Sequence, residues 1–146
     1  QQSDNIDVAG RLSHDEVLHR LGDAAIAVVP SHHCYGEGLP LTIYEAWATR
    51  TPLVSTDHPM FAHRVIHELT GLVAPEKNPA ALASEIIHAL KDAALYRRLS
   101  ENAVLGWDLL KGSIPFWPMV SGWFNDRMPS ADNWPRPIVQ PNQHHP

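Results

Sequence analysis

The sequence predicts an α/β protein with a parallel sheet flanked by helices. Short apolar runs alternate with amphipathic stretches of about a dozen residues, which is the pattern of βαβ units. The run AAIAVVPS, residues 24–31, is apolar throughout and suits a strand that is buried on both faces. Because such sheets bind ligands beyond the carboxyl ends of their strands, the loop after this run is the first place to look for a site.

The first part of the chain predicts a strand, a helix and a second strand. Residues 5–10 (NIDVAG) form a short apolar run that ends at a glycine. Ser13 and Glu16 have the spacing of a capping box, so a helix should extend from there to about Leu21. The apolar run 24–31 is the second predicted strand.

The remaining elements are predicted from apolar runs and helix-start signals. A helix should begin near Pro40, whose missing N–H costs nothing in a first turn, and end near Arg50. Asn78 is an N-cap that precedes a proline. The other predicted elements are strands at 52–56 and 71–75 and helices from about 79 to 90, 94 to 110 and 114 to 124.

Composition excludes several classes of protein. The net charge of −5 provides no basic footprint for nucleic acid, and no apolar stretch approaches the length of about 20 residues that a transmembrane helix needs. The single cysteine, Cys34, excludes an intrachain disulfide and fits a reducing compartment. We therefore expect a cytoplasmic protein, with peripheral contact at a membrane surface as an open alternative. The proline-rich residues 126–146 are predicted to be disordered or loosely attached.

Two glutamates stand close together in GEGLPLTIYEAW, residues 36–47. Glu37 and Glu45 could simply complement a helix dipole and face water. They could instead hold one ligand, because the pair straddles a strand-to-helix junction at the ligand edge of the sheet. Gly36 and Gly38 would allow close approach of a ligand to the backbone.

The start of the helix between these glutamates adds an anion site. The N–H groups of Leu41 and Thr42 lie in its first turn and have no acceptor within the helix. A phosphate at this position would have a carboxylate on either side, and carboxylates accept hydrogen bonds from paired hydroxyls. The pattern suits a ligand with a central phosphate between hydroxyl-bearing rings, as in a sugar nucleotide.

The stretch from residue 24 to 56 resembles the carboxyl half of retaining glycosyltransferases with the GT-B fold, notably family 4. That resemblance rests on two glutamates separated by seven residues, a Gly-Leu-Pro and an EAMA-like sequence. Here they are Glu37, Gly38-Leu39-Pro40, Glu45-Ala46-Trp47-Ala48 and the later Pro52. Residues 70–90 resemble the next strand and helix of the family, so the likeness covers about residues 8 to 103.

The resemblance implies that residues 1–125 are a partial nucleotide-sugar-binding, Rossmann-like domain with terminal helices. Glu37 would be the catalytic residue and would accept hydrogen bonds from hydroxyls of the donor sugar. Glu45 would hold the ribose of the nucleotide, and Leu12 would lie beside the base. No cofactor or metal is expected besides the nucleotide diphosphate sugar, which is the donor substrate.

Backbone groups complete the implied donor site. The N–H groups of Gly38 and Leu39 would face the sugar, and those of Leu41 and Thr42 would face the diphosphate. The acceptor would be a hydroxyl of a glycan, a lipid or a small molecule.

The sequence departs from the family at three places. Arg50 replaces the usual glycine, so we expect the turn after that helix to be built differently. Residues 57–61 (DHPMF) replace a Gly-Gly loop. The amino-terminal Rossmann domain and the first two strands of the donor half are missing from the alignment, which makes residues 5–10 the third strand.

The missing strands lead to an expectation about the chain by itself. Residues 5–10 would lie at a sheet edge with no native partner, and the strand at 24–31 would have an unpaired apolar edge. The isolated 146-residue chain is therefore predicted to be unstable or to associate, and to be inactive by itself.

Two further interpretations of the whole chain are open. It could be a non-catalytic, truncated remnant that still binds a sugar nucleotide, or part of a nucleotide-sugar epimerase. A metal site at His32, His33 and Cys34 is disfavoured, because adjacent residues rarely reach one ion.

Overall fold

The computed structural model describes residues 5–38, 40–110 and 116–124. The chain divides into two compact units, residues 1–109 and 110–146, each of which is described by itself. The predicted tail, residues 126–146, lies outside the described residues. Within the described part, no helix is long and apolar enough to cross a membrane.

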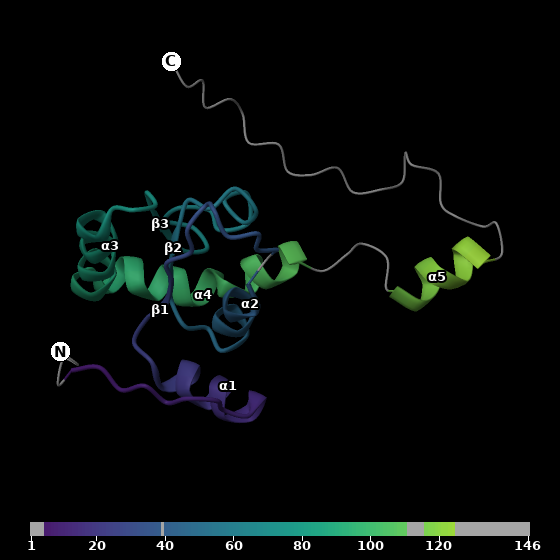
Figure 1. Ribbon diagram of the computed structural model, residues 1–146, viewed down its shortest axis with the longest axis horizontal. Coiled ribbons are helices and arrows are strands. Elements are labelled where there is room, and N and C mark those ends of the chain that lie inside the picture. The colour runs from purple at the N-terminus through teal and green to yellow at the C-terminus, as the bar shows by residue number, and fades with distance from the viewer. Residues whose placement is uncertain (1–4, 39, 111–115, 125–146) are drawn as a thin grey trace, which may run out of the picture. The chain divides into compact units, whose positions relative to one another are not determined.

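The first unit is built on a three-stranded parallel sheet (Figure 1). Its strands are β1 (Ala27–Val29), β2 (Leu53–Thr56) and β3 (Leu72–Ala74), in the order β1-β2-β3. In the register of the sheet, Val54 of β2 lies between Val28 and Leu72. The predicted α/β class with a parallel sheet flanked by helices is confirmed.

Helices separate the strands as the sequence pattern predicts. The first unit contains α1 (His14–Asp23), α2 (Leu41–Ala48), α3 (Pro79–Lys91) and α4 (Ala93–Leu110), and the second contains α5 (Phe116–Phe124). In Figure 1, α4 runs along the first unit from α3 to α2.

Both predicted N-caps are formed. Ser13 and Glu16 make the reciprocal bonds of a capping box at the start of α1. At the start of α3, the side chain of Asn78 accepts a hydrogen bond from the N–H of Ala81. Local sequence therefore determines where these two helices begin.

The core of the first unit lies where helices cover the sheet. Val54 and Leu72 pack against Ala89 of α3 and against Leu95 and Leu99 of α4. Burying aliphatic side chains of this size contributes about 1.5–3 kcal/mol each. This packing fixes the positions of β2 and β3, and β1 pairs with β2 in the same sheet.

Helix α2 is held in place by the indole of Trp47, which is only 2% exposed. The indole N–H donates a 2.8 Å hydrogen bond to the carbonyl of Thr70, just before β3. On its other side the ring meets α4 at Gly106, where a Cβ atom would come within 2.5 Å of the indole. Trp47 occupies the methionine position of the EAMA-like sequence, and Gly106 provides the room that the larger ring needs.

The predicted strand at residues 5–10 is wrong. These residues form no strand, and Ile6 and Val8 are 61% and 73% exposed. Extended backbone becomes a strand only where a neighbour accepts and donates its hydrogen bonds, and the described residues offer this segment none.

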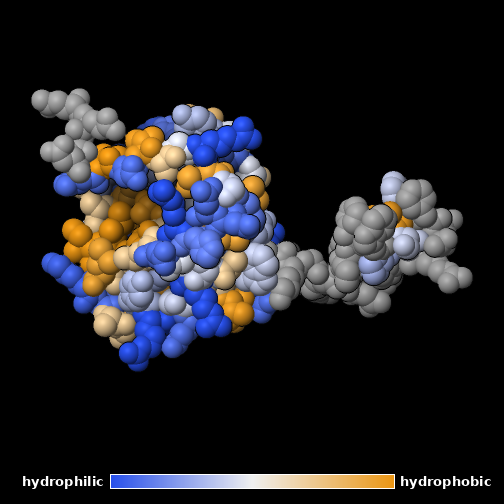
Figure 2. Space-filling view, turned by 90° about the horizontal axis from the view of Figure 1, so that it is seen from below, coloured by the Kyte–Doolittle hydropathy of each residue, from blue (hydrophilic) through white to orange (hydrophobic). Residues whose placement is uncertain are grey.

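Strand β1 is an edge of the sheet in the described part of the chain, as expected from the alignment. Val28, in the middle of β1, is exposed, as are Ile87 and Leu90 of α3. Figure 2 shows apolar side chains gathered in one hollowed area of the surface. The instability or association of the isolated chain stays a prediction.

The turn after α2 also differs from expectation. Arg50 adopts a positive φ of 58°, the left-handed conformation that glycine favours, so the turn is not built differently from one with glycine. The N–H of Thr51 bonds to the carbonyl of Ala46, and the N–H of Arg50 to that of Trp47, which together form a Schellman motif. Ser100 of α4 donates to the carbonyl of Arg50 and helps to hold the strained residue.

A first prediction tests the contact between Gly106 and Trp47. Changing Gly106 to Ala should lower the free energy of unfolding by about 1–3 kcal/mol, because the added methyl group would overlap the indole. Gly22→Ala in α1 is the matched control, since nothing lies within 4 Å of its added Cβ. That control should raise stability by about 0.4–1 kcal/mol. Urea denaturation of the protein that contains this chain measures both, and equal effects would contradict the proposed packing.

A second prediction tests the strain at Arg50. Arg50→Gly and Arg50→Ala both remove the guanidinium group, but only glycine relieves the left-handed conformation. The glycine variant should therefore be more stable than the alanine variant by about 1 kcal/mol in the same denaturation experiment. A more stable alanine variant would show that the positive φ is not maintained.

Candidate functional site

The loop after β1 places Glu37 at the carboxyl edge of the sheet. One oxygen of its carboxylate, Oε2, accepts a 2.8 Å hydrogen bond from the hydroxyl of Ser31. The N–H of Glu37 donates to the carbonyl of Tyr35. Two bonds within the loop therefore set the direction of this half-buried side chain.

Glu45 lies on α2 and turns toward α1. Its Oε1 is 3.3 Å from Nδ1 of His14, the first residue of α1. The Glu45 side chain is 15% exposed, whereas that of His14 is 70% exposed. Because Leu12 is only two residues before His14, the loop predicted to lie beside the base is brought close to Glu45.

The first turn of α2 follows Glu37 directly. Pro40 is the N-cap and provides no side-chain cap, and Leu41 and Thr42 are exposed. Their N–H groups have no intrahelical acceptor, so the positive end of the helix faces outward. Gly38 is also exposed, and Leu39 lies outside the described residues.

The structure thus brings most of the predicted site residues to one end of α2. Glu37 and the first-turn N–H groups share the edge of the sheet, and Glu45 lies farther along the same helix, next to α1. Sequence analysis missed His14, whose contact with Glu45 joins residues 31 positions apart and leaves no local signal.

Three loops at this edge are joined through His33. Its Nε2 is 3.0 Å from Oδ1 of Asp57, which follows β2, and its Nδ1 is 3.2 Å from Oε1 of Glu76, which follows β3. The backbone N–H of His33 donates a 2.8 Å hydrogen bond to Oε2 of Glu76. Asp57 in turn accepts from the N–H of Glu76, so the three residues form a closed set of contacts.

His58 connects the loop of residues 57–61 (DHPMF) to the loop that contains Glu37. It is buried and stacks on Phe61 with ring centroids 4.9 Å apart. Its Nδ1 accepts from the N–H of Met60, which leaves Nε2 as the donor toward the carbonyl of Tyr35 at 3.1 Å. The residues that replace the Gly-Gly loop therefore support the loop after β1.

The pKa of the Glu76 carboxyl group is lower than usual. The hydrogen bond from the backbone N–H of His33 lowers its pKa below the ordinary value of 4.5, and the charges of His32, His33 and Lys77 act in the same direction. Since the folded-state pKa is depressed, the stabilisation is present above pH 4.5 and is lost as the pH falls through the lowered value.

Two histidines of this edge, His32 and His33, have carboxylate partners. Besides His33, His32 lies 3.4 Å from Glu76 through its Nδ1. Among the described residues, no group of three or more His, Cys, Asp or Glu side chains could hold a metal ion.

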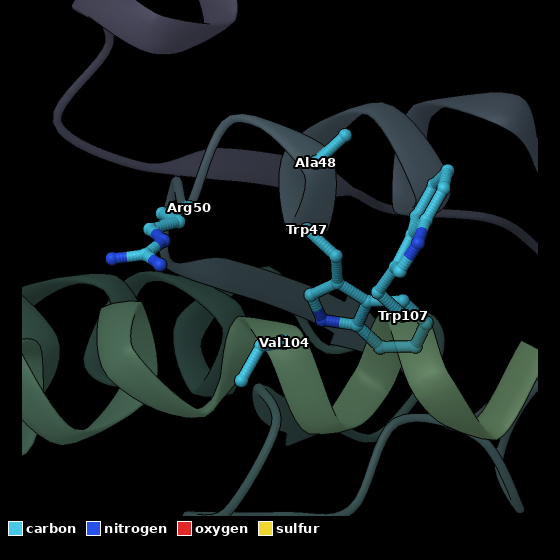
Figure 3. Close-up of a pocket in the computed structure, with 5 residues that line it drawn as sticks. All are labelled: Trp47, Ala48, Arg50, Val104 and Trp107. Atoms are coloured by element: carbon cyan, nitrogen blue, oxygen red, sulfur yellow. The ribbon is translucent and has the colours of Figure 1, made fainter.

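A separate pocket of about 290 Å³ lies between α2 and α4 (Figure 3). Side chains of the two helices face one another across it, with the guanidinium of Arg50 at one end. Its lining residues are Trp47, Ala48, Arg50, Val104 and Trp107. It contains none of the residues predicted for the site.

The arrangement can now be compared with known proteins. Residues 1–105 match the family described as Glycosyl transferases group 1. The chain belongs to this glycosyltransferase family. The crystal structure of the C-terminal domain of a glycosyl transferase group 1 family protein (LpcC) from Francisella tularensis has the same fold. It has a TM-score of 0.58 and 20% identity, and the match covers 69% of this chain and 49% of that chain.

Curated relatives agree with the family. An uncharacterized glycosyltransferase of Methanocaldococcus jannaschii is 31% identical over 98 residues, which cover 67% of this chain and 27% of that protein. A glycogen synthase of Mycobacterium tuberculosis is 35% identical over 94 residues, which cover 64% and 22%. The chain thus spans about a quarter of the length of these relatives. The predicted resemblance to a GT-B glycosyltransferase is confirmed, and the assignment to family 4 stays a prediction.

Proposed function

We propose that this chain is the donor-binding part of a retaining glycosyltransferase. The reaction transfers a sugar from a nucleotide diphosphate sugar to a hydroxyl of a glycan, lipid or small-molecule acceptor. The observation that supports this best is the position of Glu37 and Glu45 on either side of the uncapped first turn of α2. Family membership supports sugar transfer in general.

In this proposal, Glu45 holds the ribose of the nucleotide. An ionised carboxylate offers two acceptor oxygens, which match the paired hydroxyls of ribose. The contact between His14 and Oε1 orients the carboxylate. Leu12, in the loop before α1, lies beside the base.

The diphosphate lies at the start of α2. The N–H groups of Leu41 and Thr42 and the positive end of the helix dipole stabilise its negative charge. Charge on the leaving diphosphate increases in the transition state, so donors fixed at this position lower the barrier.

Glu37 receives the donor sugar. With Oε2 already bound to Ser31, the carboxylate is held in one orientation and accepts from sugar hydroxyls. The N–H groups of Gly38 and Leu39 face the same sugar. The chain's contribution to catalysis is positioning of the donor together with electrostatic stabilisation.

A third prediction separates the two glutamates. Glu45→Ala should weaken binding of nucleoside diphosphate by about 1.5–3 kcal/mol, because charge-assisted hydrogen bonds to ribose are lost. Isothermal titration calorimetry with UDP, ADP, GDP and TDP would measure it. Glu101→Ala, which removes an exposed carboxylate from α4, is the control and should bind as the unchanged protein does.

Glu37→Ala should behave in the opposite way. Its affinity for nucleoside diphosphate should be unchanged, whereas turnover of the nucleotide sugar should fall, because the sugar is what this residue contacts. Turnover is measured as release of nucleoside diphosphate from a panel of nucleotide sugars. Unchanged nucleotide affinity in Glu45→Ala would exclude the ribose assignment, and unchanged turnover in Glu37→Ala would exclude the sugar assignment.

A further inference from the structure

The imidazole of His33 lies between two carboxylates that come from different loops. Nε2 faces Asp57 at 3.0 Å and Nδ1 faces Glu76 at 3.2 Å. A neutral imidazole has one N–H and can donate to only one of them, whereas the protonated ring donates to both. The geometry therefore fits a cation that joins the loops after β1, β2 and β3.

Carboxylates and other titratable groups surround this ring. Asp57 and Glu76 supply the two carboxylates, and the N–H of His33 lowers the pKa of Glu76. Lys77 lies 3.6 Å from Glu76 Oε1, and His32, whose Nδ1 accepts from the N–H of Cys34, lies 3.4 Å from Glu76 Oε2. The rings of His58 and His33 are nearly perpendicular, with centroids 5.8 Å apart.

Contacts continue from His33 to Glu37 along the loop. The N–H of Tyr35 donates to the carbonyl of His32, and the carbonyl of Tyr35 accepts from both Glu37 and His58. At the other end of the loop, Ser31 binds the Glu37 carboxylate. Because these bonds lie in the same loop as His33, a shift of His33 away from the carboxylates would also displace the groups that hold Glu37.

We propose that His33 is a positioning residue that braces the Glu37 loop against Asp57 and Glu76, and that the brace tightens as His33 is protonated. Histidine is the side chain whose charge generally changes between about pH 5 and 8, so the test spans that range. Because the ring is partly exposed, the effect is modest. The inference rests on the proposed role of Glu37 toward the donor sugar. His33 is not among the site residues that the family resemblance implies.

The experiment compares His33→Asn with the unchanged protein at about pH 6 and about pH 8.5. The quantity measured is the ratio of the dissociation constants for UDP and UDP-glucose. The same ratio is measured in parallel for ADP and ADP-glucose and for GDP and GDP-glucose. Between the higher and the lower pH, the advantage that the sugar confers should grow about two- to fivefold more in the unchanged protein than in His33→Asn, the range that partly exposed ion pairs give. In His33→Asn the ratio should be lower at the lower pH, and it should change with pH only because the terminal phosphate of the nucleoside diphosphate titrates at about pH 6, as a second phosphate ionisation does.

Two further variants isolate the effect. His19→Asn, at an exposed histidine of α1, should keep the full pH dependence. Glu76→Gln removes one of the two carboxylates that face His33. This variant should retain only part of the pH dependence. Hydrogen exchange of residues 32–38, corrected for the intrinsic effect of pH, should show less protection in His33→Asn, most of all at the N–H groups of position 33 and of Glu37.

The outcomes separate the inference from the proposed function. An equal change of the ratio with pH in His33→Asn and in the unchanged protein, with unchanged protection of the loop, would overturn the inference even if Glu37→Ala abolishes turnover. Conversely, pH-dependent protection that disappears in His33→Asn would support the brace even if Glu37→Ala had full turnover. In that case the role of Glu37 toward the sugar, and not the brace, would be wrong.

Discussion

The site depends on one buried contact, in which the indole of Trp47 is packed between the sheet and α4. The ring binds the carbonyl of Thr70 on one side and lies against Gly106 on the other. Because Trp47 is two residues from Glu45, this contact fixes both the direction of α2 and the side of the helix on which Glu45 lies. The first turn of α2, and with it the loop that contains Glu37, takes its position from the same helix. The residues proposed to bind the donor are thus on a rigid support, although they are themselves exposed or half-buried.

At the carboxyl edge of the sheet, the loop after β2 is held by side-chain contacts where the family has two flexible glycines. The Gly-Gly loop of the family is here a segment whose Asp57 and His58 both contact the loop after β1. Each contact restricts the conformations of the loop. Together the contacts reduce the number of conformations that Glu37 can adopt. A donor that binds a loop already held in place loses less entropy on binding, which is the advantage of preorganisation. The charged groups of this edge also make the arrangement sensitive to pH in a way that glycines would not.

Local signals in the sequence predicted much of the fold, and contacts between distant residues account for the rest. The capping residues Ser13 and Asn78 were recognised because a cap involves only a few neighbouring residues. The strand at residues 5–10 was predicted wrongly because pairing depends on a neighbouring strand and not on the apolar run itself. Glu37 and Glu45 were proposed from their spacing, and their role toward a donor stays a prediction, whereas the contacts of His14 and Glu76 with this edge gave no signal in the sequence. These residues come together only in the folded chain. His14 and Glu45 are 31 positions apart in the sequence, and His33 and Glu76 are 43 positions apart.

The central claim is that the first turn of α2, Glu45 farther along that helix, and the loop before the helix bind one donor molecule. It is tested most directly by titrating the ¹⁵N-labelled protein with UDP, ADP, GDP and TDP and following the amide signals by NMR. The account predicts that one of these ligands shifts the signals of Gly38, Leu41, Thr42 and Glu45 along a single saturation curve, together with that of Leu12. Signals on the outer face of α3 should not move. Shifts confined to the pocket between α2 and α4, or separate saturation curves for Thr42 and Leu12, would contradict it.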